Sequence, residues 1–427
     1  MVYHLCMATL PTQPLILAFE EARRVVQQHA LQIDPGASEP INLLKASERV
    51  LAETITADRD IPPFPRSTRD GYAVRSGDVA KLPAKLKIIG EIKAGPEDRP
   101  RSINLGETYS IMTGAPVPSG ADAVVMVEHT SQQRDFVEIN RGVTRGENIV
   151  PQGAEAKRGT FLLDRGAKLN EAAIAVAASV GKSKVEVFVR PRIAILSTGD
   201  EIVPVEQAPG PSQIRNSNSY SLAVQIQRAG AEPVILPIAP DEPECLHRLI
   251  EQGLQSDLLI MTGGVSMGRY DFVDQVLSEL AAEFFFTGAK IQPGRPVVFG
   301  RVGHAKAATE SSPSSRYFFG LPGNPISTMV TFELFARPMV EALAGIKPHP
   351  LQFLHAKAKA DIEVKPGLTR FLPAVLTGEY ECAEVELVPW HGSGDIAAKS
   401  RANCYAVIPP TSERISAGGW VSILPHW

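Results

Sequence analysis

The sequence predicts a multidomain α/β plus β protein built around a doubly wound, mostly parallel sheet. Three observations predict this fold class. Strand-like and helix-like segments alternate through residues 191–343, short β-like runs fill residues 70–150, and β-like runs return over residues 350–427 as a small barrel or sandwich. The chain has 427 residues, which at about 150 residues per domain corresponds to roughly three domains.

Composition and charge exclude several classes of protein. Hydrophobic residues make up 44% of the chain and charged residues 21%, which excludes a disordered chain, a coiled coil and a collagen-like repeat. The formal net charge of −4 argues against a nucleic-acid partner, because nucleic-acid-binding proteins usually carry a basic excess. The four cysteines lie far apart without a CxxC spacing, so neither a disulfide framework nor a zinc site is indicated.

The sequence also bears on location. No apolar run reaches the roughly 18 residues that span a bilayer. The N-terminal segment MVYHLCMATLPTQPLILAFEEARR lacks the basic region and the small-residue cleavage site of a signal peptide, and Met7 is as good a start as Met1. Dispersed cysteines suit a reducing compartment. We therefore expect a cytoplasmic protein with no membrane partner.

The first half of the chain predicts helices on either side of a β-rich domain. Residues 16–31 have the apolar spacing of an amphipathic helix, and residues 42–53 predict a short helix that gives way to an extended, proline-ended piece. Residues 166–181 predict another helix, with Asn170 near its cap and Gly181 after its end. Between them, turn-rich segments separate the expected strands 86–92, 108–112, 122–128 and 136–139.

Residues 191–343 predict the doubly wound sheet. Each apolar strand is followed by a helical segment, the last of them a long helix over 326–345, and the Ser-rich stretch 305–316 predicts an exposed hairpin loop. Right-handed crossovers bring the carboxyl ends of parallel strands to one edge, where ligands bind in such sheets. The expected strands are 192–199, 232–239, 257–264 and 316–325, and the other helices are 218–230, 242–254 and 271–284.

Polar loops follow three of these strands. They are Ser197-Thr198-Gly199-Asp200-Glu201, Thr262-Gly263-Gly264-Val265-Ser266 and Gly320-Leu321-Pro322-Gly323-Asn324-Pro325. Each loop alone is more typical of an ordinary tight turn or of a proline at a helix start. Glycines and hydroxyls let backbone N–H groups approach an anion closely, so three such loops on one sheet predict a site of phosphate or nucleotide size.

Acidic residues accompany these loops. Asp200, Glu201, Asp241 and Asp271 each follow a strand or lie in its loop. Carboxylates beside a phosphate site usually indicate Mg²⁺, because like charges that face an anion need a cation between them. Taken singly, each aspartate is more typical of a helix cap or a turn, and Asp271 most of all.

Several segments together resemble the molybdopterin molybdenumtransferase family over about residues 16–425. Any one motif is modest, but their number, order and spacing make the match strong. The segments are STRDGYAV, IMTGAPVPSGADAVVMVE, RPRIAILSTGDEI, IRNSN, DLLIMTGGVSMGRYDFV, PGRPVVFG, FGLPGNPIS and HGSGDIA.

This resemblance implies an elongated homodimer whose chain has four subdomains. The expected boundaries are 33–62 with 151–188 for a discontinuous linking domain, 63–150 for the β-rich domain, 16–32 with 189–345 for the doubly wound molybdopterin-binding domain, and 346–427 for a C-terminal β-barrel. The active cleft is expected between the α/β domain of one subunit and the β-rich domain of the other.

The resemblance also implies an activity in molybdenum cofactor biosynthesis. Such a transferase inserts molybdate into adenylylated molybdopterin, hydrolyses the adenylate with the help of Mg²⁺, and releases AMP. Further expected partners are the molybdopterin adenylyltransferase and the enzymes that accept the finished cofactor.

Site residues follow position by position from the resemblance. The catalytic residues implied are Asp70, Thr113, Glu201, Asp241 and Asp271, with Asp241 and Asp271 near the metal. The ligand-binding residues implied are Ser197, Thr198, Gly199, Gly263, Gly264, Ser266, Arg295, Pro322, Gly323, Asn324, Pro325 and Ser393.

Basic residues are missing at some family positions. Gln292 and Gly288 stand where the family has basic side chains, Val150 replaces an arginine, and Arg295 replaces a lysine. Two alternatives therefore stay open. One is a paralogue that binds a pterin or nucleotide without inserting metal, and the other is a non-enzymatic scaffold. Molybdate and tungstate share size and charge, so the sequence does not distinguish them.

Overall fold

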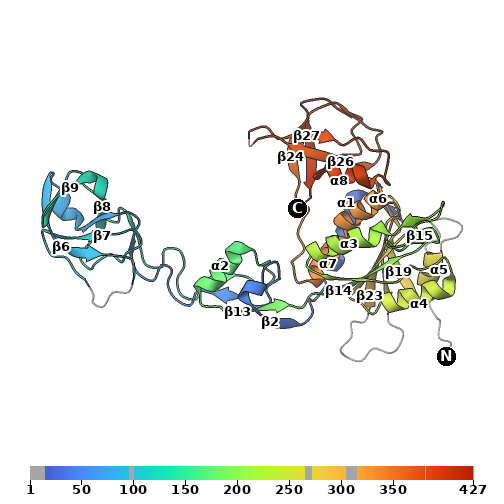
Figure 1. Cartoon of the computed structure of the whole chain (residues 1–427), viewed down its shortest axis with the longest axis horizontal. Helices are drawn as coiled ribbons and strands as arrows, with labels where there is room; N and C mark the ends of the chain where they lie inside the picture. The colour runs from blue at the N-terminus through green and yellow to red at the C-terminus, as the bar shows by residue number, and fades with distance from the viewer. Residues whose placement is uncertain (1–14, 96–100, 265–271, 304–314, 380, 427) are drawn as a thin grey trace, which may run out of the picture.

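The computed structural model describes residues 15–95, 101–264, 272–303, 315–379 and 381–426. The chain is elongated (Figure 1). A β-rich lobe lies at one end, a small linking unit lies in the middle, and the α/β sheet lies with the C-terminal barrel at the other end. The predicted fold class is confirmed: mixed sheet, β-rich lobe, discontinuous linking unit and barrel are all present.

The α/β unit contains a six-stranded sheet of order β17-β14-β18-β23-β22-β19. Its first four strands are parallel, while β22 and β19 follow in antiparallel pairings. The mostly parallel part is therefore the part that carries the three polar loops. The strands are β14 (Arg192–Ser197), β17 (Glu232–Ile235), β18 (Leu258–Thr262), β19 (Ala282–Phe286), β22 (Val298–Gly303) and β23 (Ser315–Leu321).

Both faces of this sheet are covered, which is why its strands are apolar throughout. Ile193 and Ile195 pack with α1, α3, α6 and α7, whereas Ala194 and Leu196 point to the opposite face and pack with α4 and α5. The alternation follows from the two-residue period of a strand. The helices are α1 (Phe19–Ala30), α3 (Ser217–Arg228), α4 (Pro243–Gly253), α5 (Phe272–Glu279), α6 (Pro325–Thr331) and α7 (Arg337–Leu343).

The long helix expected over 326–345 is interrupted. A π-helical turn, η4 (Phe332–Ala336), separates α6 from α7. The interruption lies next to Pro338, which has no N–H to offer the carbonyl four residues earlier, and a proline inside a helix breaks it for that reason. The helix expected over 16–31 is α1, which is preceded by a short strand, β1 (Ile16–Leu17). Most of the hairpin expected at 305–316 lies outside the described residues.

The β-rich lobe is a six-stranded sheet of order β8-β5-β7-β6-β10-β9, and the four expected strands are all present in it. Tyr72 and Val74 pack into one buried cluster, while the intervening Ala73 packs into another on the opposite face. The strands are β5 (Gly71–Val74), β6 (Ala84–Ile92), β7 (Glu107–Ile111), β8 (Ala123–Met126), β9 (Thr130–Gln133) and β10 (Phe136–Ile139).

The linking unit joins two distant segments of the chain. Strand β2 (Ser38–Asn42) pairs with β13 (Lys184–Phe188), and β3 (Ile55–Thr56) pairs with β12 (Phe161–Leu163). The helix expected over 166–181 is confirmed as α2 (Glu171–Ser179), with Asn170 accepting a hydrogen bond from the Ala173 amide.

The short helix expected over 42–53 is wrong. Only one 3-10 turn, η1 (Leu43–Lys45), forms there. Val50 and Leu51 instead make β-bridges to Lys168 and Val187 of the returning segment. Pairing across the fold thus overrides the local helical preference.

The C-terminal unit is a closed barrel. Strand β26 pairs with both β27 and β28, which closes the ring β26-β27-β24-β30-β28. Strand β21 (Ile291–Gln292) from the α/β unit adds to β26 in a parallel pairing and so fixes that loop against the barrel. The barrel strands are β24 (Leu354–Ala358), β26 (Thr369–Thr377), β27 (Glu384–Leu387), β28 (Cys404–Ile408) and β30 (Trp420–Pro425), and its helix is α8 (Ile396–Arg401).

Short paired strands complete the described structure. They are β4 (Arg66–Ser67) with β11 (Ile149–Val150), β15 (Ile202–Val203) with β16 (Ile214–Arg215), β20 (Gly288–Ala289) with β1, and β25 (Ile362–Glu363) with β29 (Arg414–Ile415). Within the described ranges, every helix is too short or too polar to traverse a lipid bilayer.

Candidate functional site

The three polar loops meet at one edge of the α/β sheet. Ser197 is in register with Thr262, and Thr262 is in register with Leu321, so the strands β14, β18 and β23 end side by side. The loops that follow them are neighbours for this reason alone. The three loops therefore lie together at the carboxyl ends of parallel strands, which is where ligands bind in such sheets.

The loop after β14 brings acidic side chains together. The Thr198 hydroxyl donates to Asp241 Oδ1 at 3.2 Å, and the Asp241 amide donates to Asp200 Oδ1 at 3.1 Å. Gly199 has a φ of +137°, and a Cβ there would lie 2.4 Å from Glu201 Oε2, so only glycine lets the Glu201 carboxylate fold back over the loop. Asp200, Glu201 and Asp241 are all exposed at this edge.

The Ser197 side chain points into the protein interior and does not face the site. Its side chain is buried, donates to Asn216 Oδ1 at 3.1 Å and lies 2.9 Å from the Ser219 hydroxyl. Asn216 in turn caps α3 by accepting from the Ser219 amide. Ser197 therefore couples the end of β14 to the start of α3.

The loops after β18 and β23 are joined through one amide. Asn218 Nδ2 donates to Thr262 Oγ1 at 3.0 Å and to the Gly323 carbonyl at 2.7 Å, while Thr262 donates to the Pro322 carbonyl at 3.2 Å. Asn218 Oδ1 is buried and has no partner among the described residues. Sequence reasoning did not single out Asn218 as a site residue, although the IRNSN segment that contains it was part of the resemblance.

Gly263 lets β14 and β18 approach at their ends. Its φ is +89°, and a Cβ there would lie 2.4 Å from the Thr198 carbonyl oxygen. Gly323 lies on the other side, since its own Cβ would lie 3.6 Å from the Gly263 Cα. Gly263 thus has backbone on both sides and needs both its conformational freedom and its missing side chain.

Two cavities open at this edge. One, of about 540 Å³, lies beside Gly199, Asp200 and Asn216 and is otherwise lined mainly by apolar side chains such as Ile235 and Leu236. A cavity of this size suits a small organic ligand. The cavity runs from the acidic loop after β14 to strand β17 at the edge of the sheet.

The other cavity, of about 470 Å³, lies where the α/β unit meets the barrel. Its walls include Gln292 and Arg295 from the β21 loop, Asn324 from the proline loop, and Ser393 from the barrel. The Ile326 amide donates to the Ser393 carbonyl at 2.9 Å and holds the two units together there. The Arg295 side chain is exposed and has no ion-pair partner among the described residues. The cavity therefore offers a cation and polar groups, which suit a small oxyanion.

Asp70 and Thr113 form a pair in the β-rich lobe. The Thr113 amide and hydroxyl donate to Asp70 Oδ1 at 2.6 and 2.9 Å. These hydrogen bonds, the backbone one above all, hold the pKa of Asp70 below its usual value. Within one chain the lobe lies at the far end from the α/β sheet, so the fold does not bring this pair to the sheet edge (Figure 1).

Some expected site residues cannot be compared with the structure. Ser266 and Asp271 lie outside the described residues. Among the described residues, no group of three or more histidine, cysteine, aspartate or glutamate side chains is arranged to hold a metal. Asp200 and Asp241 form a smaller donor set, and each keeps one carboxylate oxygen that makes no hydrogen bond within the described chain.

Gly288 is closely packed at a position where the resemblance implies a basic side chain. A Cβ there would lie 3.1 Å from the Ile16 side chain and 3.4 Å from the Arg295 carbonyl, because β20 pairs with β1 at this point. A long basic side chain would require Ile16 to move. Gln292 is exposed and lines the same cavity as Arg295, so Arg295 is the cation that this loop retains there.

Comparison with known proteins matches these units in order. The MoeA N-terminal region (domain I and II) matches residues 17–181, a probable molybdopterin binding domain matches 194–342, and the MoeA C-terminal region (domain IV) matches 355–426. The fold and these matches thus define a protein of the molybdopterin-binding class.

Full-length relatives give the family. A molybdopterin molybdenumtransferase of a Nostoc species is 35% identical over 401 residues, 91% of this chain and 88% of that protein. One from Staphylococcus aureus strain Mu50 is 32% identical over 410 residues, covering 95% and 94%. The crystal structure of a molybdopterin biosynthesis MoeA protein from Pyrococcus horikoshii OT3 superposes with a TM-score of 0.76 at 27% identity, covering 96% of this chain and all of that one. The chain belongs to the molybdopterin molybdenumtransferase family and is a transferase of molybdenum cofactor biosynthesis.

Proposed function

We propose that this transferase inserts molybdate into adenylylated molybdopterin, with Mg²⁺-dependent hydrolysis of the adenylate and release of AMP. The observation that carries the proposal is the cavity in which Arg295, Asn324 and Ser393 meet beside the strand-edge loops. A dianionic oxyanion needs a cation and directed donors where it binds. This cavity supplies both, next to loops that suit a phosphorylated pterin.

Arg295 is the proposed anchor for molybdate. Its guanidinium presents several donors in a fixed plane, which suits a tetrahedral oxyanion better than one ammonium does. Gln292 adds a neutral donor at the same wall. The two side chains together take over the role of the basic residues that the family has in this loop.

Asp200 and Asp241 fit the magnesium ion that the proposal needs. Mg²⁺ in phosphate sites is usually held by one or two carboxylates together with the phosphates of the substrate, which matches this donor set. When bound, the ion would offset the negative charge of the phosphoanhydride. Thr198 fixes the orientation of Asp241 through its hydroxyl. The large apolar part of the neighbouring cavity suits the organic portion of the substrate.

Asp70 and Thr113 are proposed to reach this site from a second copy of the chain. Within one chain they lie far from the sheet edge, so a homodimer in which the lobes are exchanged would complete two sites. Thr113 keeps the Asp70 carboxylate ionised near neutral pH. An ionised carboxylate can accept a hydrogen bond from the attacking water and orient it, but it cannot donate a proton.

The direct experiment follows AMP. The full-length protein is incubated with adenylylated molybdopterin and Mg²⁺, with and without molybdate, and AMP and metal-loaded cofactor are measured. We expect AMP release that depends on molybdate, and a severe loss of molybdate dependence in Arg295→Met. Arg301→Met is the matched control, because Arg301 forms a surface ion pair with Glu283 away from the cavity. AMP release without any metal-loaded cofactor would contradict the proposal and favour the non-inserting paralogue.

Subunit mixing tests the shared site. Asp70→Asn and Asp241→Asn chains are each expected to be inactive alone. After mixing, unfolding and refolding together, mixed dimers should regain one complete site, which gives roughly a quarter of wild-type activity for random pairing. Sedimentation of the mixture measures the dimer. No recovery in a mixture that does form dimers would show that the two residues do not act across subunits.

A further inference from the structure

Two carbonyl groups of the proline loop after β23 face the protein interior. The Pro322 carbonyl accepts hydrogen bonds from the Thr262 hydroxyl at 3.2 Å and from the Thr328 hydroxyl at 2.5 Å. The Gly323 carbonyl accepts one from Asn218 Nδ2 at 2.7 Å. All three donor side chains are buried. Two successive carbonyls of the loop are therefore held on its buried side.

The N–H groups of the same peptide units point the other way. In a trans peptide the C=O and the N–H lie on opposite sides of the chain, and both peptide bonds here are trans. The Gly323 and Asn324 amides therefore point away from the buried donors. Both residues are exposed, and neither amide donates to an acceptor among the described residues. The loop thus offers two neighbouring N–H groups on its outer side.

This loop forms one wall of the cavity proposed for molybdate. Pro322 and Asn324 line that cavity together with Arg295. An oxyanion is bound by N–H groups and repelled by carbonyl oxygens, because the oxygen is the negative end of the peptide dipole. The direction in which these peptide units face therefore decides whether this wall attracts or repels an oxyanion.

The orientation of the Asn218 amide is fixed by its partners. A carbonyl can only accept a hydrogen bond, so Nδ2 and not Oδ1 must face Gly323. Nδ2 also donates to Thr262 Oγ1 at 3.0 Å. Oδ1 is then left buried without a partner among the described residues, which costs free energy. Asn218 thus leaves one of its own atoms unpaired in the orientation that holds the loop.

Gly323 makes this support necessary. A glycine populates positive and negative φ almost equally, so the peptide units beside it rotate more easily than those beside other residues. Thr328 adds a second restraint, since its hydroxyl also donates to the Asn324 carbonyl at 3.1 Å. Without the donors of Asn218 and Thr328, the carbonyls of the loop would be free to turn outward.

We propose that Asn218 and Thr328 are positioning residues for the oxyanion of the proposed reaction. They keep the loop carbonyls inward, so that the Gly323 and Asn324 amides donate to molybdate oxygens while Arg295 supplies the charge. Neither positioning side chain touches the oxyanion. This assignment rests on the proposed function, and it adds the two groups that orient one wall of the site.

Steady-state kinetics of the full-length protein tests the assignment. Molybdate-dependent AMP release is measured with molybdate and adenylylated molybdopterin varied in turn. Asn218→Leu removes the donor without adding charge, and it should raise the KM for molybdate about tenfold or more, because charge-assisted hydrogen bonds are lost. The KM for adenylylated molybdopterin should stay close to the wild-type value. Thr328→Val should raise the KM for molybdate less, since Thr262 still donates to the Pro322 carbonyl.

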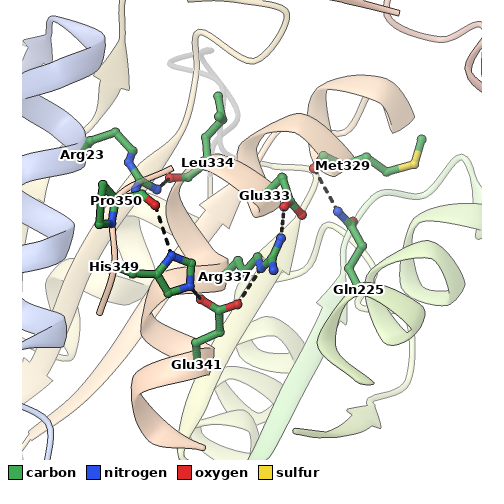
Figure 2. Close-up of polar contacts among 9 residues, drawn as sticks. All are labelled: Arg23, Gln225, Met329, Glu333, Leu334, Arg337, Glu341, His349 and Pro350. Carbon is green, nitrogen blue, oxygen red and sulfur yellow. Dashed lines mark hydrogen bonds and ion pairs between the residues drawn. The ribbon is translucent and has the colours of Figure 1, made fainter. Parts of the chain in front are cut away.

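Gln225→Leu and Thr331→Val are the matched controls. Gln225 lies on the same helix as Asn218, and its Nε2 donates at 3.1 Å to the Met329 carbonyl of α6, outside the loop (Figure 2). Thr331 lies on the same helix as Thr328, is equally buried, and donates only to carbonyls within that helix. Both control variants should keep the wild-type KM for molybdate.

The outcomes separate this assignment from the proposed function. An unchanged KM for molybdate in folded Asn218→Leu and Thr328→Val would overturn the assignment and leave the proposed function standing. A rise in the KM for adenylylated molybdopterin alone, or an equal rise in the control variants, would also overturn it. Wild-type protein without molybdate-dependent AMP release would overturn both. Circular dichroism checks the folding of each variant, and Thr328→Val keeps the test decisive if Asn218→Leu does not fold.

Discussion

Arg23 of α1 donates a hydrogen bond of 2.5 Å to the main-chain carbonyl of Leu334 in the π-helical turn (Figure 2). That carbonyl is the one that Pro338 cannot satisfy, because proline has no N–H. Burial lowers the pKa of Arg23 to about 10, against the opposing influence of Glu341 and Glu333. The guanidinium thus stays charged, and its N–H group supplies the hydrogen bond that the helix backbone lacks at the Leu334 carbonyl.

Replacing Arg23 should weaken the α/β unit. Arg23→Met leaves the buried Leu334 carbonyl without a donor, at an expected cost of about 1–3 kcal/mol in the free energy of unfolding. Urea unfolding followed by circular dichroism measures it. Arg24→Met is the control, since Arg24 is exposed on the same helix and should change stability little. Equal losses in both variants would mean that the Leu334 contact contributes nothing specific.

Thr113→Val should raise the pKa of Asp70 toward its usual value. The valine removes the side-chain hydrogen bond and keeps the backbone one, which is the larger cause of the lowered pKa, so the rise is partial. Carbon-detected NMR titration of the aspartate carboxyls measures it. If Asp70 acts as proposed, the acid limb of the pH–activity profile should move to higher pH in the same variant.

The β-rich lobe contains a matched control for this change. The Thr144 amide and hydroxyl both donate to Glu147 Oε2, and the pKa of Glu147 is lowered, mainly by the Thr144 backbone hydrogen bond. Thr144→Val should therefore raise the pKa of Glu147 and leave activity unchanged. Loss of activity in both variants would point to a general weakening of the lobe.

His349 should stabilise the fold only at low pH. Its Nε2 lies 3.4 Å from Glu341 Oε2 and its Nδ1 lies 3.1 Å from the Pro350 carbonyl, so both ring nitrogens face acceptors and the charged form is favoured (Figure 2). The hydrogen bond with Glu341 is the main cause that raises its pKa. A raised pKa contributes stability below the unfolded value of about 6.5, which is lost as pH rises through the folded value.

His349→Gln tests this dependence. At pH 5.5 the variant should be less stable than wild type by roughly 0.2–1 kcal/mol, a small value because the histidine is half exposed and the pair is screened by water. The difference should vanish once the pH exceeds the raised pKa. Unfolding free energies across pH measure it, with the exposed His355→Gln as control. A difference that does not change with pH would rule out the protonated contact.

Gly263→Ala should lower the stability of the protein by more than the cost of the left-handed backbone conformation alone. A left-handed residue other than glycine costs about 1–2 kcal/mol, and here the new Cβ would also meet the Thr198 carbonyl at 2.4 Å. Gly181→Ala is the control, because its φ is +81° with nothing within 4 Å of the added Cβ. Thermal unfolding of both should show the larger loss in Gly263→Ala, and equal losses would exclude the clash.

Local patterns predict the α/β unit well because its strands are buried on both faces and its helices have cap residues. Asn216 is one such cap, and α3 begins directly after it. Patterns fail where distant pairing decides the structure, as at Val50 and Leu51, which bridge to residues far along the chain. The interruption before Pro338 had a visible cause in the sequence, but the apolar spacing on both sides still predicts one helix.

The candidate site is only partly predictable for a related reason. The end-to-end alignment of the loops after Ser197 and Thr262 follows from parallel strands, so it can be expected from the alternation of elements. Asn218 has no spacing or charge that marks it, and its importance lies in the contacts that it makes with two loops. The meeting of Arg295 with Ser393 depends on β21 joining the barrel, which no local pattern encodes. The roles of Asp70, Thr113 and the strand-edge residues stay predictions.

The pairing of Arg66 with Val150 has a consequence for how this architecture changes over evolutionary time. The outgoing and returning chain run together as a narrow stem, so everything beyond it is a cassette inserted at a single point. The inserted segment can be shortened, lengthened or exchanged without changing the chain path of the rest of the protein. Selection can therefore tune how far the distal lobe extends independently of the chemistry at the other end.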